Sequence, residues 1–170
     1  MRKWVALCCV LFIAMGTLAL RRLKPPLKAP TPEQLQAAFP GDTRKILESS
    51  DQFILLSLDP KGFGRTQGKG TFHGYRVLGQ TVVSSKVKSE LMANFYNAMA
   101  AEGAFYAACF SPRHGIHAVR DGKPADLVIC FECMQFVVYP NKQPSYALIS
   151  RSAQPVFDRV LSNAAIPLAH

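Results

Sequence analysis

The sequence predicts an α+β fold, in which helices pack on one face of an antiparallel sheet of about five to six strands. Runs rich in β-branched and aromatic residues recur at residues 53–58, 72–83 and 125–139. Residues 84–103 instead repeat apolar side chains at helical spacing. An Asp-Gly pair, Asp121 and Gly122, lies between two strand-like runs and predicts a tight hairpin, because its turn needs positive φ at both positions. We expect an N-terminal apolar helix to precede this domain.

The N-terminal apolar run, residues 4–20, contains no charged residue. Basic residues flank it on both sides, at Arg2, Lys3, Arg21 and Arg22. A basic segment followed by an apolar one is typical of an export signal. At about 1.5 Å per residue the run spans about 25 Å, slightly less than a bilayer core of about 30 Å. Residues 1–23 are therefore predicted to be a signal peptide or a membrane anchor, with the membrane as partner through residues 4–20.

The rest of the chain is predicted to be a proline-rich linker, residues 24–31, and a single α+β domain, residues 32–170. Export places this domain in the bacterial envelope, either anchored in the inner membrane and facing the periplasm or released. The formal charge is +9, but removing the four basic residues that flank the apolar run leaves 16 basic against 11 acidic residues. That mild excess does not predict a nucleic-acid partner.

The domain begins with two short predicted helices. Thr31 is a candidate cap, Pro32 suits the first helical position, and Gln34 completes a capping box. Gly41 ends this helix, and Asp42 is a candidate cap for the next.

Two predicted strands follow, residues 53–58 and 72–83, with Gly79 marking a bulge in the second. The glycine-rich basic loop between them, residues 61–71, does not match a phosphate-binding loop. Gly70 stands where serine or threonine would bind magnesium. The helix after the second strand is expected to end at Gly103, and a last helix starts near Pro155.

The most strand-like stretch, residues 125–139, is predicted to be one bent central strand. Apolar residues occupy odd positions as far as Phe131 and even positions from Phe136. A bulge at residues 132–135 would produce that switch.

Two cysteines of this stretch, Cys130 and Cys133, have CxxC spacing. On a regular strand they would point to opposite faces, about 10 Å apart along the chain, beyond disulfide reach. Redox CxxC motifs also sit at helix N-termini. We therefore expect a disulfide from Cys109 to Cys130 or Cys133 in an exported protein, or else three buried free cysteines.

No metal or other cofactor is expected. Cys109, His114, Cys130 and Cys133 are of the types that bind zinc. However, a CxxC on a strand lacks the turn that brings two thiolates together, which makes zinc the weaker alternative.

A polar cluster of Arg113, His114 and Glu132 is the candidate functional site. A carboxylate in an apolar strand must pair or be neutralised, and Arg113 or His114 could reach Glu132 from the preceding loop. The cluster fits either a structural ion pair or acid–base catalysis. No GxSxG or HExxH motif is present.

Three segments carry a resemblance to a known family. They are FHGYRVLG at residues 72–79, ACFSPRHG at residues 108–115 and DLVICFEC at residues 126–133. They resemble those of an uncharacterised family of small exported bacterial domains, over residues 55–139. The resemblance implies an envelope location and no known activity.

These observations predict a non-enzymatic envelope domain, tethered or exported, that binds another molecule or has a structural role. The alternative is a thiol- or metal-dependent enzyme. It would use Cys109, His114, Cys130, Cys133 and Glu132.

Overall fold

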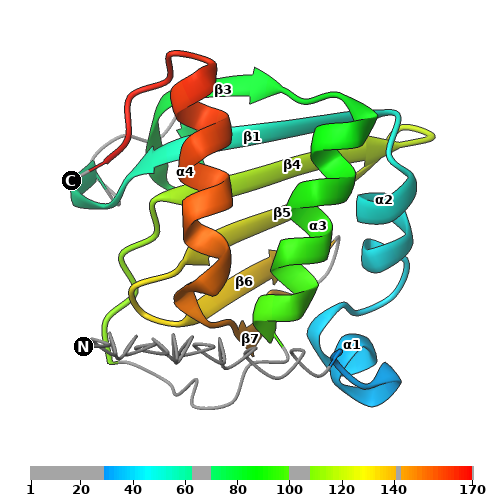
Figure 1. Cartoon of the computed structure of the whole chain (residues 1–170). Coiled ribbons are helices and arrows are strands. Elements are labelled where there is room, and N and C mark those ends of the chain that lie inside the picture. Colours follow the sequence, from blue (N-terminus) through cyan, green and yellow to red (C-terminus); the bar gives the residue numbers. More distant parts are fainter. Residues whose placement is uncertain (1–28, 63–69, 100–107, 141–142, 170) are drawn as a thin grey trace, which may run out of the picture.

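The computed structural model describes residues 29–62, 70–99, 108–140 and 143–169 (Figure 1). The helices in this part are α1 (Pro32–Ala38), α2 (Thr43–Ser49), α3 (Ser85–Met99) and α4 (Gln154–Asn163), with short 3-10 turns at Pro60–Gly62 and Arg151–Ala153. The strands are β1 (Gln52–Asp59), β2 (Thr71–Phe72), β3 (Tyr75–Val82), β4 (His114–Arg120), β5 (Lys123–Cys130), β6 (Gln135–Tyr139) and β7 (Ser145–Leu148). They form one antiparallel sheet in the order β2-β3-β1-β4-β5-β6-β7.

The predicted α+β class and antiparallel sheet are confirmed, and the sheet has seven strands among the described residues rather than about five to six. The predicted signal or anchor, residues 4–20, lies outside the described residues, as does the predicted N-terminal helix. None of the helices in the described ranges is long and apolar enough to cross a membrane.

Helices α3 and α4 cross the same face of the sheet (Figure 1). Their aromatic side chains form the centre of the main core, where Phe95 packs edge-on against Phe136 with ring centroids 4.9 Å apart. Phe157 of α4 also packs near Phe95, with ring centroids 6.3 Å apart. All three rings are fully buried, and each buried aromatic of this size contributes about 1.5–3 kcal/mol to stability.

Local sequence signals set several boundaries as predicted. The capping box of α1 is present: the Gln34 amide donates to Thr31 Oγ1, and the Thr31 amide donates to Gln34 Oε1. The hairpin between β4 and β5 turns at Asp121 and Gly122, with φ values of 49° and 72°. Both positive angles are those that a type I′ turn requires.

The predicted strand at residues 72–83 is instead a hairpin. β2 and β3 are joined by His73 and Gly74, both with positive φ, at 49° and 86°. Further along β3 the register shifts opposite Ser57, so the bulge predicted at Gly79 is confirmed. The hairpin was missed because apolar residues continue on both sides of its turn.

The prediction of one bent strand at residues 125–139 is wrong. β5 ends at Cys130 and β6 begins at Gln135, and the Met134 amide donates to the Phe131 carbonyl across the turn between them. The switch of apolar positions from odd to even, interpreted as a bulge, is this turn.

The C-terminal segment after α4 lies against the helix-bearing face of the sheet. A side chain at Gly79 would place its Cβ 2.8 Å from Cγ2 of Ile166, so only glycine allows this close approach. The Ser57 hydroxyl donates to the Pro167 carbonyl at 2.6 Å. The segment therefore covers β3 and β1 beside α4, and the opposite face of the sheet lacks an equivalent helical layer in the described residues (Figure 1).

Candidate functional site

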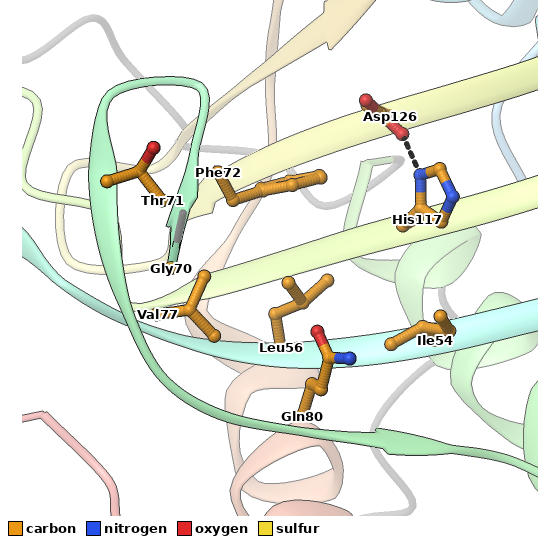
Figure 2. Close-up of a pocket in the computed structure, with 9 residues that line it drawn as sticks. All are labelled: Ile54, Leu56, Gly70, Thr71, Phe72, Val77, Gln80, His117 and Asp126. Carbon is orange, nitrogen blue, oxygen red and sulfur yellow. Dashed lines mark hydrogen bonds and ion pairs between the residues drawn. The ribbon is translucent and has the colours of Figure 1, made fainter. Parts of the chain in front are cut away.

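The opposite face of the sheet carries a pocket of about 570 Å³ (Figure 2). Residues from five strands and the loop before β2 line it: Ile54, Leu56, Gly70, Thr71, Phe72, Val77, Gln80, His117 and Asp126. A smaller apolar cluster underlies it, formed by Leu56, Leu58, Tyr75 and Val128. This volume is in the range of small-molecule sites, which lie between about 300 and 1,000 Å³.

The β2–β3 hairpin forms one wall of the pocket. Its Phe72 ring points from the hairpin toward His117 and Asp126 (Figure 2). The ring lies over Gly115 of β4, where a Cβ would come within 3.0 Å of Phe72 Cε1. Because Gly115 has no side chain, the Phe72 ring can pack directly on the sheet. Ile54 and Leu56 form the apolar floor of the pocket.

The polar end of the pocket is a carboxylate shared by two imidazoles. Asp126 Oδ1 lies 2.6 Å from Nδ1 of His117, and Asp126 Oδ2 lies 2.7 Å from Nε2 of His73. Each contact fits an imidazole N–H that donates to a carboxylate oxygen. With Nδ1 held by Asp126, Nε2 of His117 has no other partner in the described residues and can hydrogen-bond a ligand.

A stacked pair of rings fixes the tip of the hairpin. The His73 ring lies parallel to the Tyr139 ring of β6, with centroids 3.7 Å apart and an interplanar angle of 13°. Burial raises the pKa of Tyr139, and burial also raises the pKa of nearby Tyr75 to about 12. Both phenols are therefore neutral at physiological pH, and the hairpin tip rests on uncharged aromatic surface.

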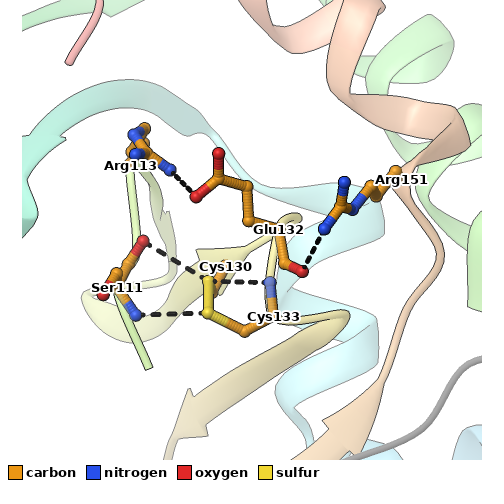
Figure 3. A network of polar contacts seen from close by, with 6 residues as sticks. All are labelled: Ser111, Arg113, Cys130, Glu132, Cys133 and Arg151. Carbon is orange, nitrogen blue, oxygen red and sulfur yellow. Dashed lines mark hydrogen bonds and ion pairs between the residues drawn. A yellow bond between two sulfur atoms is a disulfide. The ribbon is translucent and has the colours of Figure 1, made fainter. Parts of the chain in front are cut away.

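The predicted disulfide pairing is wrong. The structure joins Cys130 to Cys133 (Figure 3). Cys109 is free and exposed. The prediction failed because both cysteines were placed on one extended strand. Across the turn that actually connects β5 and β6, their Cα atoms are 5.2 Å apart, which is within disulfide range.

The disulfide is buried and enclosed by backbone. Cys130 is 0% and Cys133 2% exposed. The Ser111 amide donates to Cys133 Sγ at 3.3 Å, and the Cys133 amide donates to Cys130 Sγ at 3.1 Å (Figure 3). An attacking thiol would need this segment to open before it could reach either sulfur.

The candidate cluster of Arg113, His114 and Glu132 is divided between two sites. Arg113 forms an ion pair with Glu132, whose side chain is 52% exposed. Arg151 donates to the Glu132 carbonyl at 2.8 Å (Figure 3). His114 points to the helix-bearing face instead, where its Nε2 lies 2.8 Å from Asp158 Oδ1.

His114 is part of the core rather than of an open site. Its ring lies edge-on to Phe131 and to Phe157, at centroid distances of 5.2 and 5.8 Å, and these two rings also contact each other. A cavity of about 210 Å³ beside it is lined by Arg113, His114, Gln154, Asp158, Leu168 and Ala169. The cysteines and Glu132 do not line this cavity.

The four zinc-type residues Cys109, His114, Cys130 and Cys133 do not form a metal site. Cys130 and Cys133 form the disulfide, and His114 is hydrogen-bonded to Asp158. Over the described ranges, no group of three or more histidine, cysteine, aspartate or glutamate side chains could hold a metal ion.

Two pocket residues, His117 and Asp126, and the His73 that contacts Asp126 were not predicted. Two of them could have been found from the sequence. In a two-residue hairpin, residues at equal distances from the turn face each other, and a turn at Asp121 and Gly122 places His117 opposite Asp126. The contribution of His73 depends on how the β2–β3 hairpin folds over the sheet, which no local pattern indicated.

No family model, curated protein or solved structure matches this chain.

Proposed function

We propose that this chain is a non-catalytic binding domain of the bacterial envelope, and that its ligand site is the pocket on the open face of the sheet. The observation that carries the proposal is the pairing of an apolar floor with one oriented polar group. Ile54, Leu56 and Phe72 supply the floor and wall, and His117 is oriented by Asp126. Binding sites commonly combine a mostly apolar lining with a few placed polar groups.

The expected ligand is a small molecule or side chain with an apolar body and a hydrogen-bonding head. The head would meet Nε2 of His117 or the amide of Gln80, and the body would cover Ile54 and Leu56. Among the described residues that line the pocket there is no serine, cysteine or lysine, and Thr71 supplies the only hydroxyl.

The envelope location is supported by the apolar run at residues 4–20 and by the resemblance to exported bacterial domains. A buried disulfide is also characteristic of oxidising compartments such as the periplasm. Fusion of a reporter that is active only outside the cytoplasm, placed after His170, should give an active reporter. An inactive reporter, with a cytoplasmic one active at the same position, would contradict the location.

The alternative, a thiol- or metal-dependent enzyme, receives less support. Its five residues do not converge on one cavity: two form the buried disulfide, His114 is in the core, and Glu132 pairs with Arg113 at the surface. A catalytic site needs such groups to surround a common position for the reacting atom.

Ligand-observed ¹⁹F NMR tests the proposal. A set of fluorinated aromatic and aliphatic amides and acids would be screened against the full-length chain in a mild detergent, with empty micelles as the blank. Hits should bind the unmodified chain and bind at least about tenfold more weakly to Ile54→Phe, whose ring would fill the floor of the pocket.

Gln52→Phe is the matched control for this screen. Gln52 lies on the same strand and the same face as Ile54, is exposed and does not line the pocket. It should leave fragment binding unchanged. Absence of any protein-dependent hit, or equal loss of binding in both variants, would contradict a site at this pocket.

A further inference from the structure

Within the described residues, the outer edge of β3 has no strand partner along most of its length. β2 has only two residues, and it pairs with β3 at Tyr75 and Arg76 alone. The Val77 amide then donates to the Gly70 carbonyl at 2.9 Å, which closes the hairpin. Beyond that point, no other strand of the described residues pairs with this edge of β3.

The ladder between β1 and β3 determines which backbone groups face outward. The Val83 amide donates to the Phe53 carbonyl at 3.0 Å, so the backbone N–H and C=O groups of Val83 point toward β1. Along an antiparallel strand, the backbone N–H and C=O groups of successive residues point alternately to one neighbouring strand and to the other side. The backbone groups of Thr81 therefore also point toward β1, whereas those of Gln80 and Val82 point outward, away from β1.

Apart from one bulge, the described part of this edge carries none of the usual features that protect a sheet edge against pairing. Residues 77–83 contain no charged residue and no proline, and Val82 is 65% exposed. The bulge opposite Ser57 affects only the start of the segment.

The other edge of the sheet is different. β7 has four residues and follows Pro144, and the Ser145 hydroxyl donates to the Ala37 carbonyl at the end of α1. A proline, a short strand and an adjacent helix all limit pairing at an edge. The two edges thus differ in their capacity to accept another strand.

We propose that β3 of a second copy of this chain occupies the open edge, so that two sheets join antiparallel across a two-fold axis at Thr81. Around this axis Gln80 of each copy faces Val82 of the other. The outward N–H and C=O groups then satisfy one another in four interchain hydrogen bonds. This register uses only the regular part of β3 and avoids its bulge.

A second copy fits the edge because the segment is self-complementary. Without charges in residues 77–83, two copies meet without like-charge repulsion. Pairing also covers Val82, which becomes a neighbour of Gln80 in the other copy. Since Gln80 lines the pocket, the dimer would set the two ligand sites on the same face of one continuous sheet, one on each side of the two-fold axis.

Cysteine cross-linking of the full-length chain in a mild detergent tests this register. At the axis, the two Thr81 residues would form a non-hydrogen-bonded pair with Cα atoms about 4.5 Å apart, which suits a disulfide. Thr81→Cys should form a covalent dimer on mild oxidation, and peptide mapping should show residue 81 joined to residue 81. Tyr146→Cys, exposed on the opposite edge strand, should not form its own cross-link.

Sedimentation velocity of Val82→Pro supplies the second measurement. Proline removes an outward N–H from each copy without breaking the β1 ladder, so self-association should weaken by roughly tenfold or more while the melting transition stays cooperative. Equal cross-linking at positions 81 and 146 would overturn the proposal. So would unmodified protein that stays monomeric at all concentrations, or dimerisation that Val82→Pro leaves unchanged.

Discussion

The imidazole of His73 lies 2.7 Å from the carboxylate of Asp126, although 53 residues separate the two in the chain. This contact fastens the tip of the β2–β3 hairpin to β5, on the far side of β1 and β4. The same carboxylate orients His117 through its other oxygen. One side chain therefore both closes the wall of the pocket and sets the direction of its main polar group.

Replacement of Asp126 by asparagine should lower the free energy of unfolding by about 1–3 kcal/mol, because two charge-assisted hydrogen bonds are weakened at once. Urea denaturation measures the change. Asp121→Asn is the matched control: its side chain is 79% exposed in a turn where asparagine also tolerates positive φ, so its effect should stay below about 0.5 kcal/mol. Equal effects of the two substitutions would contradict a structural role for Asp126.

Loss of the disulfide should destabilise the domain only moderately. The bond closes a very short loop, so the double substitution Cys130→Ala and Cys133→Ala should cost about 2 kcal/mol through the unfolded state. Cys109→Ser should be nearly neutral because Cys109 is exposed and unpaired. Mass mapping of non-reduced peptides should show Cys130 linked to Cys133, and a peptide linked through Cys109 would contradict the structure.

His114 and Glu132 should differ sharply in their contribution to stability. His114→Ala removes a buried ring that packs against Phe131 and Phe157 and takes away the histidine partner of Asp158, so it should cost about 2–4 kcal/mol. Glu132→Ala breaks only a half-exposed ion pair with Arg113 and should cost less than about 1 kcal/mol. Chemical denaturation of both variants decides whether His114 is a core residue, and equal small effects would contradict that assignment.

Stability should fall as the pH rises above 10. The pKa of Tyr75 is about 12 in the folded chain, mainly because of burial, against 10.0 for an exposed tyrosine. Between pH 10 and pH 12, Tyr75 loses its proton in the unfolded chain but retains it in the folded chain. The contribution of Tyr75 to stability is therefore fully present below pH 10 and is lost as the pH rises toward 12. Urea denaturation at pH 9, 10 and 11 should show this decline, and Tyr75→Phe should make it shallower. An unchanged slope in Tyr75→Phe would contradict the burial of this phenol.

The sequence predicted those parts of the fold that depend on local signals. The Asp121–Gly122 turn and the capping box at Thr31 each need only a few neighbouring residues to specify them. The turn between Cys130 and Cys133 lacks glycine, asparagine and proline, and its apolar residues imitate a strand. Contacts outside the local pattern accompany this turn: the Cys130–Cys133 disulfide and the packing of Phe131 against His114.

The candidate site was predicted less well for the same reason. The cysteines and Glu132 are conspicuous in the sequence because of their chemistry, whereas the pocket combines ordinary residues from separate strands. The pair of His117 and Asp126 follows from the hairpin register, but the contact of His73 with Asp126 joins residues 53 apart in the sequence and no local pattern indicates it.

Side-chain NMR of a bound fragment tests the central claim most directly. Methyl groups of Ile54, Leu56 and Val77 on the open face and of Leu127 and Val138 in the helix-side core would be labelled, together with the histidine imidazoles. Addition of the strongest fluorinated fragment should shift the first three methyl signals and the His117 ring, and leave the two core methyls in place. Shifts confined to Leu127 and Val138, or no protein shift at saturating fragment, would contradict a ligand site on this face.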